Sequence, residues 1–323
     1  MRAAGVRQTG RMVMNTAAAL AHGTESLRSA EPAERAAGCD LLGAAADRDE
    51  TVQDDAATAL LALAERERDG RVLARLAEAL GRTRDGRAVP VLVALAGHPD
   101  AEVRGQVAAA LWPAEVLTGP PDAPGVRALI GLTRDPDPEV RDAATFTLGF
   151  QCEADGPDVR AALWERTFDD HLDAREEGVR GLARRRDPRA LPLLVELLAD
   201  PDGAAVLTFH AAEILGAPEL LPLLEDYDPD DPGVADAVAA CDPARRARLD
   251  DAAWALVCAV QRLRPDLAPA VWATRCEPGL TLGVHGDPDA PGYDVAALLA
   301  RANGDPARAA DLVESDHPVI IRS

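Results

Sequence analysis

Residues 135–149 read DPDPEVRDAATFTLG, and this stretch decides the fold because its pattern returns along most of the chain. It consists of a turn rich in proline and aspartate, followed by a phrase of the form apolar-Arg-x-x-small-x-x-x-Leu-Gly. The leucines that close each copy of the phrase are Leu42, Leu80, Leu111, Leu148, Leu182 and Leu215. Successive leucines lie 31 to 38 residues apart, which is the length of a helix pair and too long for one leucine-rich repeat.

A second recurring phrase predicts the first helix of each pair. It reads RAVPVLVAL at residues 87–95, RALPLLVEL at 189–197 and ELLPLL at 219–224. Proline in the first turn of a helix removes an amide donor that has no partner there, so it marks a helix start. The turns at 98–100, 135–138 and 200–203 contain proline and aspartate, and we expect the last aspartate of each turn to cap the following helix.

In the second helix of each pair, apolar or small residues recur with the 3.6-residue period of an amphipathic helix. One such pair cannot cover its own apolar face, so it must stack on its neighbours. The sequence therefore predicts an all-α fold, a right-handed α-solenoid of about six to seven helix pairs with a C-terminal helical cap. We assign residues 1–28 to a flexible leader, 29–242 to the solenoid and 243–323 to the cap. The cap should contain a long helix over 243–263 and two short helices on either side of 303–306.

The two phrases together, D-x-R-A-V/L-P-x-L and then D-P-D-x-E-V-R-x-x-A-x-x-x-L-G, resemble the HEAT repeat. Within that group they are similar to the short bacterial HEAT-like repeats named after phycobilin lyases, and the resemblance covers about residues 32–242. It implies a ladder of turn aspartates and second-helix arginines, which here are Asp100 with Arg104, Asp137 with Arg141, and Asp170 or Asp173 with Arg175. Proteins with such repeats include scaffolds, chromophore lyases, DNA glycosylases and hydroxylases, so the fold alone does not select a function.

Composition excludes several of these classes. The chain has a formal charge of −21, and residues 29–242 alone carry −22, from 21 arginines and 43 acidic residues. A protein that grips nucleic acid needs a cationic face, so we expect no nucleic-acid partner. Apolar residues make up 47% of the chain but aromatic residues only 3%, which predicts a core of Ala, Leu and Val.

Five cysteines occur singly, with no C-x-x-C pair, so neither a disulfide framework nor a zinc site is expected. Cys152, which follows 149–151, is the cysteine with the most interest for chemistry. The pair His210 and Glu213 supplies only two of the four ligands that a metal site needs. The sequence contains no catalytic or nucleotide-binding motif. No run of 18 apolar residues exists, so no membrane span is expected. We predict a cytoplasmic protein with no cofactor, no metal and no catalytic residues.

The exposed positions of the second helices form the expected binding groove. Counted from the phrase leucine, these are the residues two, five and six positions before it. The predicted partner-binding residues are Asp40, Glu78, Asp142, Phe146, Glu176, Glu177, Arg180, Phe209, His210 and Glu213. An acidic rim around aromatic anchors is suited to a basic protein or peptide.

We therefore predict a non-catalytic protein-binding module, a scaffold, adaptor or inhibitor, that holds a basic partner. Two alternatives stay open at this point. One is an accessory protein or chromophore lyase of the phycobilin-lyase type, and the other is an immunity protein that neutralises a cationic toxin.

Overall fold

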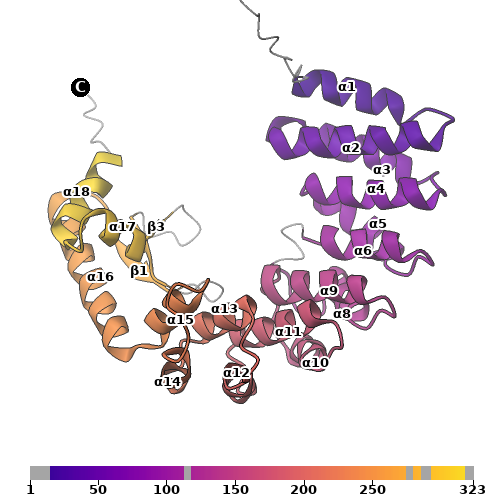
Figure 1. Ribbon diagram of the computed structural model, residues 1–323. Helices are drawn as coiled ribbons and strands as arrows, with labels where there is room; N and C mark the ends of the chain where they lie inside the picture. Colours follow the sequence, from indigo (N-terminus) through magenta and orange to yellow (C-terminus); the bar gives the residue numbers. More distant parts are fainter. Residues whose placement is uncertain (1–14, 113–117, 274–278, 285–291, 317–323) are drawn as a thin grey trace, which may run out of the picture. The chain divides into compact units, whose positions relative to one another are not determined.

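The computed structural model describes residues 15–112, 118–273, 279–284 and 292–316 (Figure 1). The chain forms two compact units, residues 1–159 and 160–323. The division falls inside helix α10 (Pro157–Arg166), in the middle of the predicted repeat region.

The first unit is built of helix pairs. Its elements are α1 (Thr16–Ser26), α2 (Pro32–Arg48), η1 (Glu50–Val52), α3 (Gln53–Ala64), α4 (Gly70–Arg82), η2 (Gly86–Ala88), α5 (Val89–Leu95), α6 (Ala101–Ala110), α8 (Pro124–Leu132), α9 (Pro138–Phe146) and the π-helical turn η3 (Thr147–Gln151). The predicted second helices α2, α4, α6 and α9 pack side by side in that order (Figure 1). This arrangement confirms the predicted solenoid within the unit.

Helix α1 corrects the predicted flexible leader. Residues 16–26 are helical and pack along α2, and Ala19 and Leu27 are buried in that contact. Asn15 accepts a hydrogen bond from the amide of Ala18 and so caps the helix. Its sequence contains neither of the two repeat phrases, which is why it read as a leader. Residues 1–14, the remainder of that predicted segment, lie outside the described residues.

The second unit continues the repeats and ends in a mixed region. Its elements after α10 are α11 (Leu172–Arg184), α12 (Ala190–Leu198), α13 (Val206–Leu215), η4 (Pro218–Leu220), α14 (Leu221–Leu224), α15 (Val234–Cys241), α16 (Pro243–Leu263), β1 (Ala270–Trp272), β2 (Thr281–Gly283), β3 (Tyr293–Asp294), α17 (Val295–Arg301) and α18 (Pro306–Asp316). Helices α11, α13 and α15 are the second helices and pack against each other in turn.

Aspartate caps set the starts of several second helices, as predicted. Asp100 accepts the amide of Glu102 at 3.0 Å, and Asp137 accepts the amide of Glu139 at 3.0 Å. The prediction was wrong at the turn 200–203, because α13 begins after Ala205, whose side chain cannot cap it. Residues 204 and 205 separate this turn from the helix.

The glycine of the Leu-Gly phrase has a packing role. Leu42 and Leu80 are fully buried, and the glycines that follow them lie against the next second helix. A Cβ atom on Gly43 would lie 3.1 Å from the Cα of Ala79, and a Cβ on Gly81 would lie 2.9 Å from the Cα of Ala110. Because glycine has no Cβ atom, the backbones of successive second helices can pack in direct contact at these positions.

Ion pairs between successive repeats correct the predicted ladder. Arg104 pairs not with its own turn aspartate, Asp100, but with Asp135 of the next turn, through Nε to Oδ2 at 2.6 Å and Nη2 to Oδ1 at 2.8 Å. Arg35 pairs in the same way with Glu67, at 2.6 and 3.0 Å. Each arginine also donates to two carbonyls of its own turn, and in the turn of Arg104 the capping Asp100 accepts a backbone amide. The bonds therefore join one repeat to the next.

Around the other two predicted rungs the structure gives backbone contacts of the arginine or of the turn. Arg141 donates to the carbonyls of Asp135 and Pro136, and Asp137 accepts backbone amides at the start of α9. The N-cap of α11 is His171, whose amide donates to Asp169 rather than to Asp170 or Asp173.

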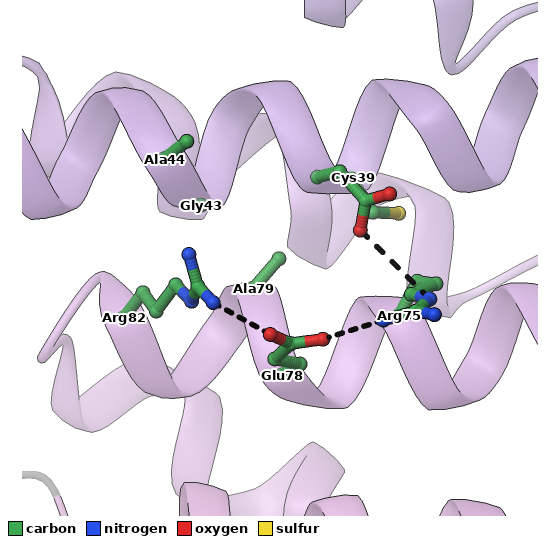
Figure 2. A pocket seen from close by; sticks show the side chains of 8 residues that line it. Cys39, Gly43, Ala44, Arg75, Glu78, Ala79 and Arg82 are labelled. Atoms are coloured by element: carbon green, nitrogen blue, oxygen red, sulfur yellow. Dashed lines mark hydrogen bonds and ion pairs between the residues drawn. The ribbon is translucent and has the colours of Figure 1, made fainter.

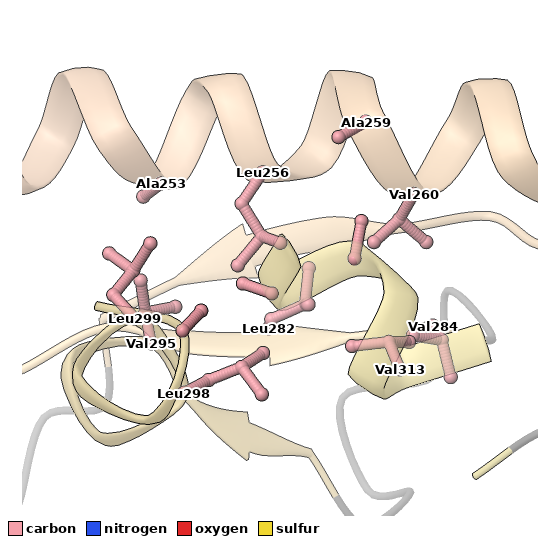
Figure 3. Close-up of a cluster of buried hydrophobic side chains, with 13 residues drawn as sticks. Ala253, Leu256, Ala259, Val260, Leu282, Val284, Val295, Leu298, Leu299 and Val313 are labelled. Atoms are coloured by element: carbon pink, nitrogen blue, oxygen red, sulfur yellow. The ribbon is translucent and has the colours of Figure 1, made fainter. Parts of the chain in front are cut away.

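The C-terminal region has its own core and contains more than helices. Helix α16 has the predicted bounds, and α17 and α18 meet at Asn303 and Gly304, whose positive φ values of 55° and 77° end one helix before the next begins. Between α16 and α17 the structure adds a three-stranded antiparallel sheet, in the order β1-β2-β3, where the sequence indicated only loops. Figure 3 shows the shared core of α16, β2, α17 and α18, with Leu256 and Leu282 at its centre.

The strands escaped prediction because they are only two or three residues long. Their register places Ala270 opposite Gly283, and a Cβ atom on Gly283 would meet the Trp272 ring at 2.0 Å. Only glycine at this position leaves room for the Trp272 indole to lie over the neighbouring strand. Among the described residues, no helix is long and apolar enough to cross a membrane.

Candidate functional site

The structure places the ten predicted binding residues in three different environments. Asp40 is exposed, and Glu78, Asp142, Phe146, His210 and Glu213 are half-buried. The other four, Glu176, Glu177, Arg180 and Phe209, are between 3% and 7% exposed. The prediction that all three chosen positions point away from the core is therefore wrong for these four residues.

The position six residues before the phrase leucine faces the neighbouring second helix. Glu176, on α11, accepts a hydrogen bond from the Thr208 hydroxyl of α13 at 3.1 Å. Burial raises the pKa of Glu176 above its ordinary value, more than this hydrogen bond lowers it. Phe209 occupies the same position on α13 and packs edge-on against Tyr227, with ring centroids 5.0 Å apart. Both side chains join repeats and are not open to a partner.

Glu177 and Arg180 are buried on the same helix. Their side chains form an ion pair of 2.6 Å one helical turn apart, with 7% and 8% of each side chain exposed. A buried pair of this kind neutralises both charges. Neither residue presents free charge to a partner.

A hollow on the first unit contains two of the predicted acids, but its charges cancel. Asp40 on α2 and Glu78 on α4 line a cavity of about 350 Å³ together with Arg75 and Arg82. Figure 2 shows Glu78 between Arg75 and Arg82. Arg75 lies 3.0 Å from Glu78 and 4.0 Å from Asp40, and Arg82 lies 2.6 Å from Glu78. Two carboxylates and two guanidinium groups leave this surface close to neutral, so it does not attract a basic partner through net charge.

Asp142 and Phe146 lie on α9, where both are half-buried. The ring of Phe146 lies 5.6 Å from that of Phe150, which is 38% exposed. The predicted aromatic anchor therefore exists on this helix as a pair of rings, of which Phe150 is the more accessible.

A larger cavity on the second unit brings carboxylates together without neutralising them. It has a volume of about 470 Å³ and lies among α13, α15, α16, β2 and the start of α17. Glu213 of α13 and Asp236 of α15 line it, beside the apolar side chains of Ile214 and Leu249. Burial, and after it the charge of Asp236, raise the pKa of Glu213. Neither carboxylate makes an ion pair or hydrogen bond with another described residue.

Two of the three arginines that line this cavity bind backbone carbonyls, and the third, Arg245, lies 3.8 Å from Asp242. Arg186 donates to the carbonyl of Leu215 at 3.4 Å, and Arg246 donates to the carbonyl of Gly216 at 3.0 Å. Both therefore cap the C-terminal end of α13, where carbonyls lack helical partners. The two carboxylates remain the groups that can bind a cation.

The sequence identified Glu213 but not Asp236. The repeat phrase fades before α15, so its exposed positions were not included in the groove. A signal was nevertheless present, because Val234, Ala237 and Cys241 mark the buried stripe of this helix and place Asp236 off that stripe.

Three of the described cysteines, Cys39, Cys152 and Cys241, are buried, which makes them poorly suited to nucleophilic chemistry. Burial raises the pKa of Cys39 to about 12 and that of Cys241 to about 11, so both thiols are protonated at neutral pH. Cys152 is 1% exposed and its amide donates to the carbonyl of Thr147. Within the described parts of the chain, no three His, Cys, Asp or Glu side chains come close enough together to hold a metal ion.

Comparison with known proteins identifies the family. The family model described as HEAT repeats matches residues 20–112 and 126–215, more than half of the chain. The chain therefore belongs to the HEAT-repeat family. No curated protein matches it at a significant level.

Solved structures of other proteins are similar to the chain. YibA of Escherichia coli is 23% identical with a TM-score of 0.52, over 69% of this chain and 80% of YibA. The complex of CpcE and CpcF of phycocyanin lyase from Nostoc sp. is 18% identical with a TM-score of 0.44, over 75% of this chain and 91% of the matched chain. Human deoxyhypusine hydroxylase is 20% identical with a TM-score of 0.31, over 69% of this chain and 83% of the other. At 23% identity the likeness to YibA concerns the fold alone.

Proposed function

We propose that this HEAT-repeat protein is a non-catalytic binding module that holds a basic segment of a partner protein. The single observation that carries the proposal is the cavity of the second unit, where Glu213 and Asp236 lie together and neither makes an ion pair with a described residue. The raised pKa of the half-buried Glu213 means that its ionised form is less stable in the folded protein than in water. An arginine or lysine side chain from a partner would supply the missing cation.

The shape of the cavity supports a peptide side chain as the occupant. Its volume of about 470 Å³ is in the range of small-ligand sites. Ile214, Leu249 and Leu280 provide an apolar lining for the methylene groups of an arginine or lysine, while the two carboxylates can bind its charged end. The cavity therefore offers apolar contacts to the stem of a long basic side chain and carboxylates to its charged end.

The non-catalytic part of the proposal rests on the cysteines. A chromophore lyase that uses a cysteine needs a thiolate, and burial holds Cys39 and Cys241 in the protonated form. An absorption spectrum of the protein purified without added ligand tests this part. A bound pigment would overturn it.

Binding of a fluorescein-labelled peptide of nine arginines, measured by fluorescence anisotropy, tests the basic-partner part. Glu213→Gln combined with Asp236→Asn should weaken binding roughly tenfold at low salt, the equivalent of about 1.4 kcal/mol. The double variant should also reduce the salt dependence of the affinity.

The matched control is Asp47→Asn combined with Glu196→Gln. It removes the same two charges from exposed positions on α2 and α12, outside the cavity. We expect the control to bind within about twofold of the unmodified protein, because exposed charges at a distance are screened. Equal weakening in the two double variants would show that only net charge matters, and would refute the cavity as the site.

A further inference from the structure

One edge of the second unit exposes large apolar side chains that its fold leaves uncovered. Phe168, Leu172 and Val206 are 65%, 50% and 43% exposed. Phe168 and Leu172 flank the tight turn between α10 and α11, and Val206 is the first residue of α13. We name these three side chains the apolar edge patch.

Neighbouring contacts hold the apolar edge patch in place. The Phe168 ring packs edge-on against Trp164 with centroids 5.0 Å apart, and the guanidinium of Arg189 lies over the same indole at 4.7 Å. Leu172 and Val206 begin two second helices that pack against each other. A rigid, pre-positioned aromatic and two aliphatic side chains are typical of a docking surface.

The charge of the turns around the apolar edge patch indicates which kind of partner can bind there. The turns that lead into α11, α13 and α15, residues 167–173, 199–205 and 225–233, contain ten acidic residues and no arginine. The hydroxyl of Tyr227 in the third turn donates to the carbonyl of Leu198 beside the second, so these turns are neighbours. Asp170, Asp173 and Asp202 are exposed and make no ion pair with described residues.

The corresponding turns of the first unit differ. Residues 27–31, 65–69, 96–100 and 133–137 include four arginines among their acids. The three turns of the second unit are therefore more acidic than those of the first, and they lie on the edge that also carries the apolar edge patch. A partner suited to this edge has an apolar strip flanked by basic side chains.

We infer that this edge is a second docking surface, which binds a basic amphipathic helix of a partner protein. The apolar side of the helix covers Phe168, Leu172 and Val206, and its lysines and arginines lie against the turn carboxylates. This surface involves none of the cavity residues, so it stands independently of the function proposed above.

The test uses a fluorescein-labelled amphipathic peptide of 18 leucine and lysine residues and the full-length protein. Leu172→Ser combined with Val206→Ser should weaken binding about tenfold. Both residues are exposed first residues of helices, so the substitution leaves the core intact. Circular dichroism of the variant should match that of the unmodified protein.

The matched control is Trp254→Ser combined with Leu263→Ser, which removes exposed apolar side chains from α16, where they are 69% and 41% exposed. Its affinity should stay within about twofold. Asp170→Asn combined with Asp173→Asn should lower the salt dependence of binding, which the apolar variant retains. Hydrogen exchange should show protection at 167–173 and 199–206 on peptide binding.

Equal weakening by the patch and control variants would overturn the inference, as would protection confined to α13, α15 and α16 around the cavity. The variant Glu213→Gln with Asp236→Asn separates the two sites. It should bind this amphipathic peptide normally even if the cavity proposal is correct, and a large loss here would mean that the peptide occupies the cavity instead.

Discussion

The bond between Arg35 and Glu67 gives the sharpest test of how successive repeats hold together. Glu67 accepts Arg35 through Nε at 2.6 Å and Nη2 at 3.0 Å, and it also accepts the amides of Arg68 and Asp69. Only 3% of its side chain is exposed. Hydrogen bonding to Arg35, which outweighs desolvation, lowers the pKa of Glu67 from 4.5 to about 2.

We expect Glu67→Gln to reduce the free energy of unfolding by about 3 kcal/mol at pH 7. The pKa difference of about 2.5 units corresponds to this amount at roughly 1.36 kcal/mol per unit. Because folding lowers this pKa, the stabilisation is fully present above pH 4.5 and disappears as the pH falls through about 2. At pH 3 the same substitution should therefore cost only roughly 1.4 kcal/mol.

Glu78→Gln provides the control, since it makes the same chemical change on an exposed ion pair of the neighbouring helix. The side chains of Arg82 and Glu78 are 41% and 28% exposed, so about 0.5 kcal/mol is expected. Urea denaturation followed by circular dichroism measures the overall loss, and hydrogen exchange in α2 and α4 locates it. The reasoning is refuted if Glu67→Gln costs no more than Glu78→Gln, or costs as much at pH 3 as at pH 7.

Three further predictions concern packing, charge and thiols. Gly81→Ala should destabilise the protein by about 1–3 kcal/mol, whereas Gly131→Ala, where a Cβ meets nothing within 4 Å, should be neutral or stabilising in urea denaturation. Glu176→Gln should raise the melting temperature at pH 7 and lose this benefit below pH 4.5, because burial penalises the ionised form alone; an unchanged melting temperature at pH 7 would contradict this. Cys39 and Cys241 should react with a thiol reagent only as fast as the protein opens, so rapid labelling under native conditions would show that the thiols are accessible.

Much of the fold was predictable because it depends on short-range patterns. The Leu-Gly phrase, the early prolines and the turn aspartates each specify a helix start, a helix face or a close approach within one repeat. Repetition then specifies stacking, since every pair has the same uncovered face. The three short strands were not predictable, because pairing of two or three residues depends on segments that are far apart in sequence.

The candidate site was predictable only in part. The 3.6-residue period separates the buried side of a helix from its exposed side, but it cannot say which flank the neighbouring helix covers. Glu176 and Glu213 both read as exposed groove acids, yet the first is bonded to Thr208 and the second lines a cavity. Four residues separate the two positions in the repeat, so only about 40° around the helix axis separates these outcomes.

The sequence by itself determined that this chain is an acidic HEAT-repeat solenoid, because repeat length, helix signals and charge are properties of the local sequence. Only the tertiary structure decided which of its charges are free. Asp40 and Glu78 are neutralised by arginines that stacking brings beside them, whereas Glu213 meets a second carboxylate, Asp236, from another repeat. The electrostatic state of a side chain depends on distances across the stack, and those distances exist only once the repeats have packed.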